Sequence, residues 1–149
     1  MEPKLFGYNL FVDDRGTFTN IPLNYPELNF EGKRTYVCSN FQSGTVRGFH
    51  YHDREQKIFI CLKGAVKFVL LNGVQDGRNR LGLTPQTFVL SENSSKALYI
   101  PAKYANAWQS LTDDTVLLGI SDVTVEESIN DDKRFDPKVL QNVWEVRWR

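Results

Sequence analysis

The stretch VRGFHYHDREQKIFICLKG, residues 46–64, decides the fold. It contains both histidines of the chain, His50 and His52, separated by one residue. Alternate side chains of an extended strand project from the same face, so we expect the two imidazoles to point together. The polar run 53–56 predicts a turn, and Lys57 opens an apolar run that predicts a second strand. The unit is therefore a strand, a turn and a strand with a cationic opening that carries both imidazoles.

Short β-prone runs recur through the rest of the chain and are separated by turn signals. They are two runs that flank the turn 13–16, followed by 34–41, 65–71, 87–90, 97–100 and 115–121. Asn72-Gly73 is a strong hairpin signal, 77–80 predicts another turn, and 91–95 and 101–106 are predicted to be loops. Only the segment 137–143 is predicted to be helical. The regular spacing of strands predicts an all-β fold, a jelly-roll barrel formed by residues 1–149 as a single domain.

Composition and charge exclude several classes of function. Lys plus Arg and Asp plus Glu are 18 each among 149 residues, so no strong field attracts nucleic acid or a membrane. No apolar run approaches the length of a membrane span, and the start lacks a signal-peptide pattern. Cys38 and Cys61 lie far apart in apolar runs and are expected to be reduced thiols. These features predict a cytoplasmic protein that binds neither nucleic acid nor membrane.

Two segments resemble the motifs of the cupin superfamily. His50-x-His52, Lys57 and Gly64 follow the first motif, in which Glu normally stands at the position of Lys57. The segment PAKYAN, residues 101–106, resembles the second motif, in which metal cupins carry His in place of Asn106. The resemblance implies an RmlC-like cupin barrel. A lysine cation at a ligand position opposes a divalent metal, so we expect neither a metal nor another cofactor.

Most of the chain also resembles the dTDP-4-dehydrorhamnose 3,5-epimerase family. DRGTF (14–18) is similar to the family's nucleotide-contacting segment, VRGFHY (46–51) to its catalytic strand, and LYIP (98–101) to its later cupin loop. The run Arg-Gly-Phe-His-x-His (47–52) is shared with the neighbouring sugar 3,4-ketoisomerases. The resemblance implies a nucleotide-sugar isomerase or epimerase that acts on a dTDP-linked 4-keto-6-deoxyhexose in deoxysugar or surface-polysaccharide synthesis. It also implies a homodimer in which the N-terminal strand crosses to the partner.

The chain departs from the epimerase family at four positions. Leu118 or Gly119 stands where the family has the tyrosine that acts as its general acid. Asn106 replaces a family histidine, and His52 replaces a family glutamine. Its aspartate partner of the catalytic histidine would lie beyond Arg149, so we expect this partner to be missing. Three functions stay open: a 3,5-epimerase, a 3,4-ketoisomerase, and a sugar-nucleotide-binding cupin without turnover.

Three residues of the central stretch are the candidate catalytic groups. A neutral imidazole titrates near the working pH, so His50 suits the base that removes a carbon-bound proton beside a ketone. Lys57 on the adjoining strand can stabilise the resulting enolate oxygen. His52 can relay or return a proton.

The candidate substrate-binding residues lie in four separate segments. Arg15 and Arg47 suit the diphosphate, because a guanidinium offers a bidentate fork to phosphate oxygens. Tyr36 and Trp108 can provide aromatic walls, and Asn106 a hydrogen bond in the pocket. Alternatives stay open for three of them: Arg15 as a turn ion pair with the preceding aspartates, Trp108 as a core or interface residue, and Asn106 as a loop cap.

Overall fold

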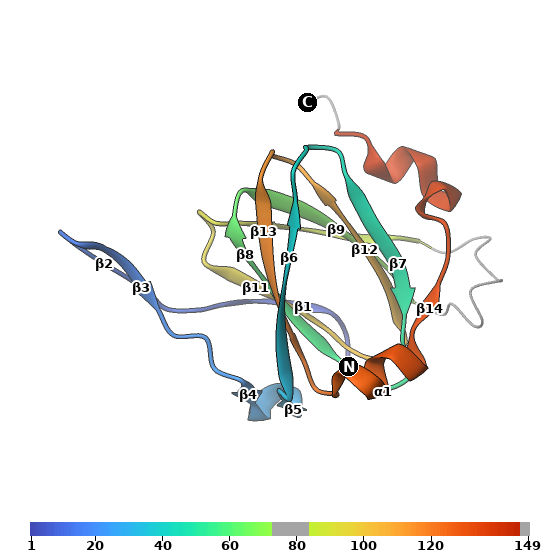
Figure 1. Ribbon diagram of the computed structural model, residues 1–149, viewed down its shortest axis with the longest axis horizontal. Helices are drawn as coiled ribbons and strands as arrows, with labels where there is room; N and C mark the ends of the chain where they lie inside the picture. The colour runs from blue at the N-terminus through green and yellow to red at the C-terminus, as the bar shows by residue number, and fades with distance from the viewer. Residues whose placement is uncertain (73–83, 147–149) are drawn as a thin grey trace.

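The structure is a computed structural model that describes residues 1–72 and 84–146. Two five-stranded antiparallel sheets face each other (Figure 1). The first has the order β1 (Lys4–Gly7), β11 (Lys96–Ile100), β8 (Lys57–Lys63), β13 (Thr115–Ser121), β6 (Arg34–Asn40). The second has the order β10 (Gln86–Ser91), β9 (Ala65–Asn72), β12 (Tyr104–Ser110), β7 (Val46–Tyr51), β14 (Lys133–Arg134). The prediction of an all-β cupin jelly roll is confirmed.

The remaining elements lie outside these sheets (Figure 1). They are the hairpin β2 (Leu10–Asp13) and β3 (Gly16–Thr19), the pair β4 (Asn24–Tyr25) and β5 (Phe30–Glu31) with the 3₁₀ turn η1 (Pro26–Leu28), helix α1 (Val125–Asp131), and the 3₁₀ segment η2 (Pro137–Trp144). The hairpin β2–β3 projects away from the two sheets, whereas α1 and β14 lie beside the end of β7 (Figure 1).

The main core fills the space between the two sheets, and β8 shows how the strand period divides it. Phe59 and Cys61 belong to this interior core, whereas Ile58 and Ile60 on the opposite face pack against the segment that contains β4 and β5. Burying each large apolar side chain contributes roughly 1.5–3 kcal/mol. Lys57 has the same parity as Phe59, so the strand directs it into the interior with the core residues.

The outer face of each sheet is covered by a segment of irregular structure. Tyr25 and Phe30, from β4 and β5, cover the first sheet. On the second sheet Phe49 stacks on Phe135, with ring centroids 4.8 Å apart, and Trp144 of η2 lies at the same cluster. Both sheets therefore bury apolar residues on two faces, which explains the nearly continuous apolar runs of their central strands.

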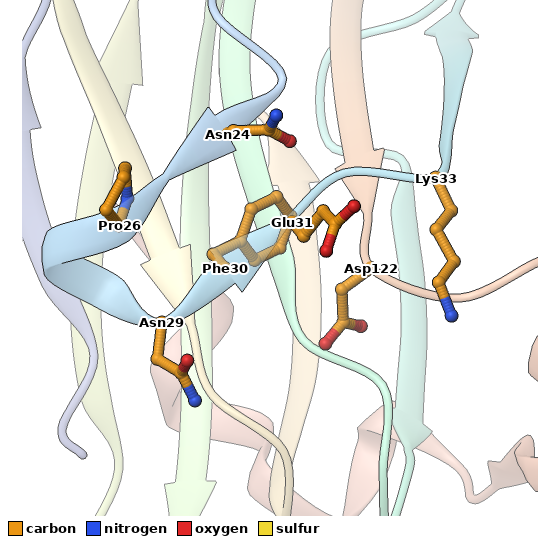
Figure 2. A pocket seen from close by; sticks show the side chains of 7 residues that line it. All are labelled: Asn24, Pro26, Asn29, Phe30, Glu31, Lys33 and Asp122. Atoms are coloured by element: carbon orange, nitrogen blue, oxygen red, sulfur yellow. The ribbon is translucent and has the colours of Figure 1, made fainter.

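A polar hollow of about 460 Å³ lies where β4 and β5 meet the chain after β13 (Figure 2). Its wall includes Asp122, which accepts hydrogen bonds from the backbone N (2.7 Å) and side-chain Nε2 (2.9 Å) of Gln56. Gln56 immediately precedes Lys57, so this carboxylate fixes the point at which β8 begins.

Two local features differ from the predictions, and a third agrees with them. Residues 101–106 were expected to form a loop, but β12 begins at Tyr104, because Ala105 and Ala107 pack into the cluster under η2 while Asn106 faces inward. Helix α1 was not predicted, although Thr124 and Glu127 form a capping box at its start. The predicted helix at 137–143 is confirmed as the 3₁₀ segment η2. The hairpin signal at Asn72-Gly73 reaches the limit of the described residues, and the turn at 77–80 lies outside them.

Two expectations drawn from the composition can be compared with the described residues. Cys38 and Cys61 are both free thiols, as expected. Among residues 1–72 and 84–146, no helix is long and apolar enough to cross a membrane.

Candidate active site

A cavity of about 480 Å³ opens at one end of the two sheets. Side chains of β6, β7, β8, β12 and α1 line it, together with the residues that follow β7 and α1. Seven of the residues singled out from the sequence are among them: Tyr36, Arg47, His50, His52, Lys57, Asn106 and Trp108. The fold thus gathers four separate segments of the sequence around one cavity.

Arg15 is the predicted site residue that lies elsewhere. It is on the β2–β3 hairpin, which projects away from the two sheets (Figure 1). Its side chain is exposed and paired with Asp13, whose Oδ1 also accepts a hydrogen bond from the backbone N of Arg15 at 2.9 Å. Within this chain, the alternative of a turn ion pair is therefore the observed state of Arg15.

The two imidazoles face the same side, as the strand period predicts. The His50 and His52 ring centroids are 6.5 Å apart and the planes are inclined by 14°. Asn106 lies opposite His50 in the sheet, and its Nδ2 donates to the His50 carbonyl at 3.2 Å. Gly48 allows this approach: its φ is +112°, and a Cβ there would lie 2.7 Å from the Asn106 carbonyl oxygen.

His50 has an aspartate partner, contrary to the expectation that this group is missing. Its Nδ1 lies 3.0 Å from Oδ1 of Asp132, and Nε of Arg134 donates to Oδ2 of Asp132 at 2.6 Å. The aspartate lies at the end of α1 rather than beyond Arg149, because β14 pairs with β7 and sets Arg134 opposite His50. Burial opposes ionisation of Asp132, but hydrogen bonds from Arg134 and His50 outweigh it, so the pKa of Asp132 lies below its ordinary value.

His52 is held between a cation and two carboxylates. Nζ of Lys57 lies 3.1 Å from its Nδ1, and its Nε2 lies 3.0 Å from Oε2 of Glu55 and 3.3 Å from Oδ1 of Asp132. Burial, followed by the Lys57 cation, lowers the pKa of His52 to about 4. His52 is therefore a neutral imidazole at neutral pH, and Asp132 Oδ1 joins it to His50.

Lys57 faces the cavity from β8, as predicted from its position in the motif. Burial lowers the pKa of its ammonium group, although Glu55 and Asp132 oppose this effect. The Nζ–Glu55 Oε2 distance is 3.6 Å. The negative charges of Glu55 and Asp132 therefore offset the positive charge of the Lys57 ammonium group at the edge of the cavity.

Glu55 is a site residue that sequence reasoning missed. Its side chain has no exposed area and lies in the loop between β7 and β8. It accepts hydrogen bonds from Nη2 of Arg34 (2.9 Å), Oγ of Ser121 (2.7 Å) and Oγ of Ser128 (2.7 Å). The signal in the sequence was weak, because a lone glutamate three residues after a histidine in a polar run is typical of a solvated turn.

A phenol lies where the missing tyrosine was expected. Tyr36 on β6 pairs with Gly119 on β13, and a Cβ at Gly119 would lie 2.4 Å from Cζ of the Tyr36 ring. The absence of a side chain at Gly119 therefore makes room for the Tyr36 ring, which lines the cavity. Burial, with a contribution from the Glu55 charge, raises the pKa of Tyr36, so its hydroxyl keeps its proton at neutral pH.

Arg47 and Trp108 complete the wall opposite α1. Nε of Arg47 donates to Oδ1 of Asn40 at 2.6 Å and Nη2 donates to the Ser39 carbonyl at 3.0 Å, which orients the exposed guanidinium. Trp108 is buried and lies against Phe68, with ring centroids 6.5 Å apart. Trp108 is thus both a core residue and part of the cavity floor.

Comparisons with known proteins agree with this geometry. A family described as "FdtA: WxcM-like, C-terminal" matches residues 1–139. The TDP-4-oxo-6-deoxy-alpha-D-glucose-3,4-oxoisomerase of Aneurinibacillus thermoaerophilus is 30% identical over 73 residues, which are 49% of this chain and 52% of that protein. The match thus spans about half the length of this curated relative.

Two solved structures show the same fold at low sequence identity. The dTDP-4-dehydrorhamnose 3,5-epimerase of Bacillus anthracis has a TM-score of 0.73 at 23% identity, covering 89% of this chain and 77% of that one. A 3,4-ketoisomerase from Helicobacter canadensis has a TM-score of 0.72 at 23% identity, covering 97% and 99%. The family match extends over the strands and the helix that form the cavity, and the chain belongs to the FdtA, WxcM-like C-terminal family.

Proposed function

We propose that this chain is a 3,4-ketoisomerase of a nucleotide-linked 4-keto-6-deoxyhexose, with the dTDP-linked 4-keto-6-deoxyglucose as the first substrate to test. The observation that carries the proposal is the pair of imidazoles on one wall of the cavity, joined by Oδ1 of Asp132. A keto shift needs proton movement between neighbouring carbons of one ring, and a base on one wall can reach both. The name of the Aneurinibacillus relative supports the same reaction class.

In the first step His50 removes the proton from C3 of the sugar. Its Nδ1 faces Asp132, so Nε2 is the nitrogen available for this proton, and the carboxylate stabilises the imidazolium that forms. The electron pair of the C3–H bond forms the C3=C4 double bond, and the C4 ketone oxygen takes up a proton. Tyr36, which stays protonated at neutral pH, is the donor that we assign to this oxygen.

In the second step the enediol collapses toward C3. The C3 hydroxyl gives a proton back to the Tyr36 oxygen and becomes the ketone, while His50 returns a proton to C4. The products contain the same atoms as the substrate, and no electron acceptor is required. Lys57, on β8, lines the same cavity and stabilises the negative charge that develops on the enediol oxygens.

The decisive experiment is proton and carbon NMR of the nucleotide sugar with the protein in deuterated buffer. We expect the ketone to move from C4 to C3, with deuterium appearing at the carbon that receives a proton. His50→Asn should reduce the rate by at least about 10²-fold, the usual contribution of a general base. Unchanged substrate with no deuterium uptake would contradict turnover and leave the binding-only alternative.

A 3,5-epimerase is the second candidate, and the position of Tyr36 supports it. The Tyr36 ring fills the space beside Gly119, so the chain has a phenol although its epimerase-like tyrosine position is empty. Epimerisation would label C3 and C5 and leave the ketone at C4, so the same spectra distinguish the two reactions.

We further propose that the chain works as a homodimer. The hairpin β2–β3 carries exposed apolar side chains, including Phe11 (56% exposed), Val12 (71%) and Phe18 (62%), and extends from the body (Figure 1). Surface of this kind is typical of an interface. Strand β1 pairs with β11 of the same chain, so the crossing segment that we propose is this hairpin. An Arg15 that bound a diphosphate would then do so in the partner's cavity.

A further inference from the structure

Glu55 is a buried carboxylate that is contacted by side chains from several strands and from helix α1. Its hydrogen-bond donors come from β6, β13 and α1: Arg34, Ser121 and Ser128. Nε2 of His52 lies 3.0 Å and the ammonium group of Lys57 3.6 Å from its Oε2. An unpaired carboxylate at such a position would cost several kcal/mol, so these contacts are what allow it to be buried. The charges around it are the cations Arg34 and Lys57 and the anion Asp132, which lies against the same nitrogen of His52, Nε2, as Glu55 does.

The loop that carries Glu55 is fixed by backbone contacts. Oδ1 of Asp131 accepts a hydrogen bond from the backbone N of Asp53 (3.1 Å), and Oδ2 accepts from those of Arg54 (2.9 Å) and Glu55 (3.4 Å). Asp122 accepts from the next backbone N, that of Gln56, at 2.7 Å. The position of the Glu55 carboxylate is thus set by the protein itself rather than by a ligand.

Opposite an ammonium group at Lys57, hydrogen-bond chemistry at His52 allows one neutral tautomer. The Lys57 ammonium group has donors and no acceptor, so Nδ1 of His52, 3.1 Å away, must present its lone pair. The ring proton is then on Nε2, which faces Oε2 of Glu55 at 3.0 Å. Asp132 is the weaker second acceptor, because it lies 3.3 Å away and its oxygens also engage His50 and Arg134.

We propose that Glu55 is a positioning residue that holds His52 in the neutral Nε2–H tautomer, with the lone pair of Nδ1 directed at the Lys57 ammonium group. Glu55 thereby keeps His52 from competing with His50 for the proton of the substrate. It also balances the charge of Lys57, which remains available to the enediol oxygens. This consequence for catalysis rests on the proposed isomerase function, whereas the tautomer is a property of the free protein.

Glu55→Gln changes the charge and the hydrogen-bond donors with little change in shape. The carboxamide oxygen can still accept from Arg34 and Ser121, but its NH₂ group would point a donor at Nε2 of His52. The ring must then accept at Nε2 and carry its proton on Nδ1, opposite the Lys57 ammonium group. Two donors would face each other there, so Lys57 loses its proton at lower pH.

The test is a long-range ¹H–¹⁵N correlation spectrum of the imidazoles in the full ¹⁵N-labelled chain at pH 7. The chain has two histidines, and His50→Asn identifies the remaining signals as those of His52. We expect His52 to be protonated on Nε2 in the wild type and to shift toward Nδ1 in Glu55→Gln. The matched control is Glu92→Gln, an exposed carboxylate that accepts from the backbone N of Gly64, and it should leave the spectrum of His52 unchanged.

Lys57→Met separates the role of Glu55 from that of the cation. We expect His52 to keep the Nε2–H tautomer and to titrate at higher pH, because the anion remains and the neighbouring cation is gone. A tautomer change in Lys57→Met would overturn the proposal, and it decides the question even if Glu55→Gln does not fold. The proposal also fails if wild-type His52 is an imidazolium or carries its proton on Nδ1, or if Glu55→Gln matches the wild type.

Steady-state kinetics provide a second test, which requires that the protein turns over its substrate. In Glu55→Gln we expect kcat to fall roughly tenfold or more with a smaller change in KM, and the alkaline limb of the kcat profile to move to lower pH. A wild-type protein without turnover would contradict the proposed function, while the tautomer result would still support or overturn the role of Glu55.

Discussion

At the scale of single residues, the site depends on how each imidazole is partnered. His50 is one-third exposed and bound to Asp132, whereas His52 is buried between Lys57 and Glu55. The two rings have the same chemistry and nearly parallel planes, yet they have different hydrogen-bond partners and different burial. The Lys57 cation beside His52 also favours a site without a transition metal, and that absence stays a prediction to be tested by elemental analysis.

Asp132→Asn tests the partner of His50. The amide cannot stabilise the imidazolium that forms when His50 takes a proton, so we expect kcat to fall by about 100-fold or more with KM little changed. Steady-state kinetics of the keto shift measure this. Asp136→Asn, which retains a side-chain cap for η2, is the control and should keep the wild-type rate. Wild-type kcat in Asp132→Asn would remove the aspartate from the mechanism.

The depressed pKa of His52 makes stability depend on pH. The unfolded chain takes up a proton at His52 near its ordinary pKa of 6.5, whereas the native protein does so only near 4. Between these values the unfolded state binds more protons, so the free energy of unfolding falls as the pH is lowered, by up to about 3 kcal/mol. Urea denaturation between pH 7 and 4.5 should show a shallower decline in His52→Gln. Parallel curves for the two proteins would contradict the buried neutral imidazole.

At the scale of secondary structure, α1 and its flanks bring polar groups to the cavity. The helix supplies Ser128 to Glu55 and Asp131 to the backbone of the β7–β8 loop, and Asp132 is the C-cap residue that follows it. Strand β14 then pairs with β7 and holds the aspartate beside His50. A single short helix therefore orients both imidazoles, although none of its own residues is buried.

Thr124→Ala tests this dependence on α1. Thr124 accepts from the backbone N of Glu127, and loss of an N-cap costs about 1 kcal/mol of unfolding free energy. We expect this loss in chemical denaturation together with a fall in kcat, because the helix that carries Asp132 begins to fray. Val125→Ala changes an exposed side chain in the same turn without touching the cap and should leave both quantities near wild type. Equal effects of the two substitutions would disprove the role of the cap.

At the scale of the whole molecule, the hairpin β2–β3 is the element whose apolar side chains the rest of the described chain leaves exposed. It pairs only with itself among the sheets of the described residues, while its apolar side chains face outward. A paired hairpin with an exposed apolar surface is marginal in isolation, which favours a second copy of this chain as its support.

Sedimentation of the full chain tests the dimer. We expect a dimer at micromolar concentration and a monomer for the double variant Phe11→Ser, Phe18→Ser, which keeps the hairpin turn. Arg15→Ala should leave the dimer intact, because it removes an exposed charged side chain and none of the apolar ones, and it should weaken binding of TDP by removing the guanidinium proposed for the diphosphate. A monomeric wild type would contradict the homodimer.

The sequence by itself determined those features that depend on spacing along one strand. The period of two sets His50 and His52 on one face, and it needs no knowledge of the neighbours. The position of Lys57 in the cupin-like motif predicted that it faces the interior. The alternating and apolar runs likewise predicted the strands and the jelly roll. Strand β12 was missed in part because Asn106 resembles a loop residue, and packing of the adjacent alanines overrides that propensity.

Only the tertiary structure decided the partners of these residues. Asp132 lies 82 positions from His50, and the β14–β7 pairing that joins them has no signature in either segment. Tyr36 fills the space beside Gly119 because β6 and β13 pair in that register. Glu55 lies in a polar run that resembles a solvated turn, and it is buried because three distant elements, β6, β13 and α1, supply its hydrogen-bond donors. Long-range pairing is set by the packing of the whole chain, so local patterns identify the candidate catalytic groups but not the contacts that tune them.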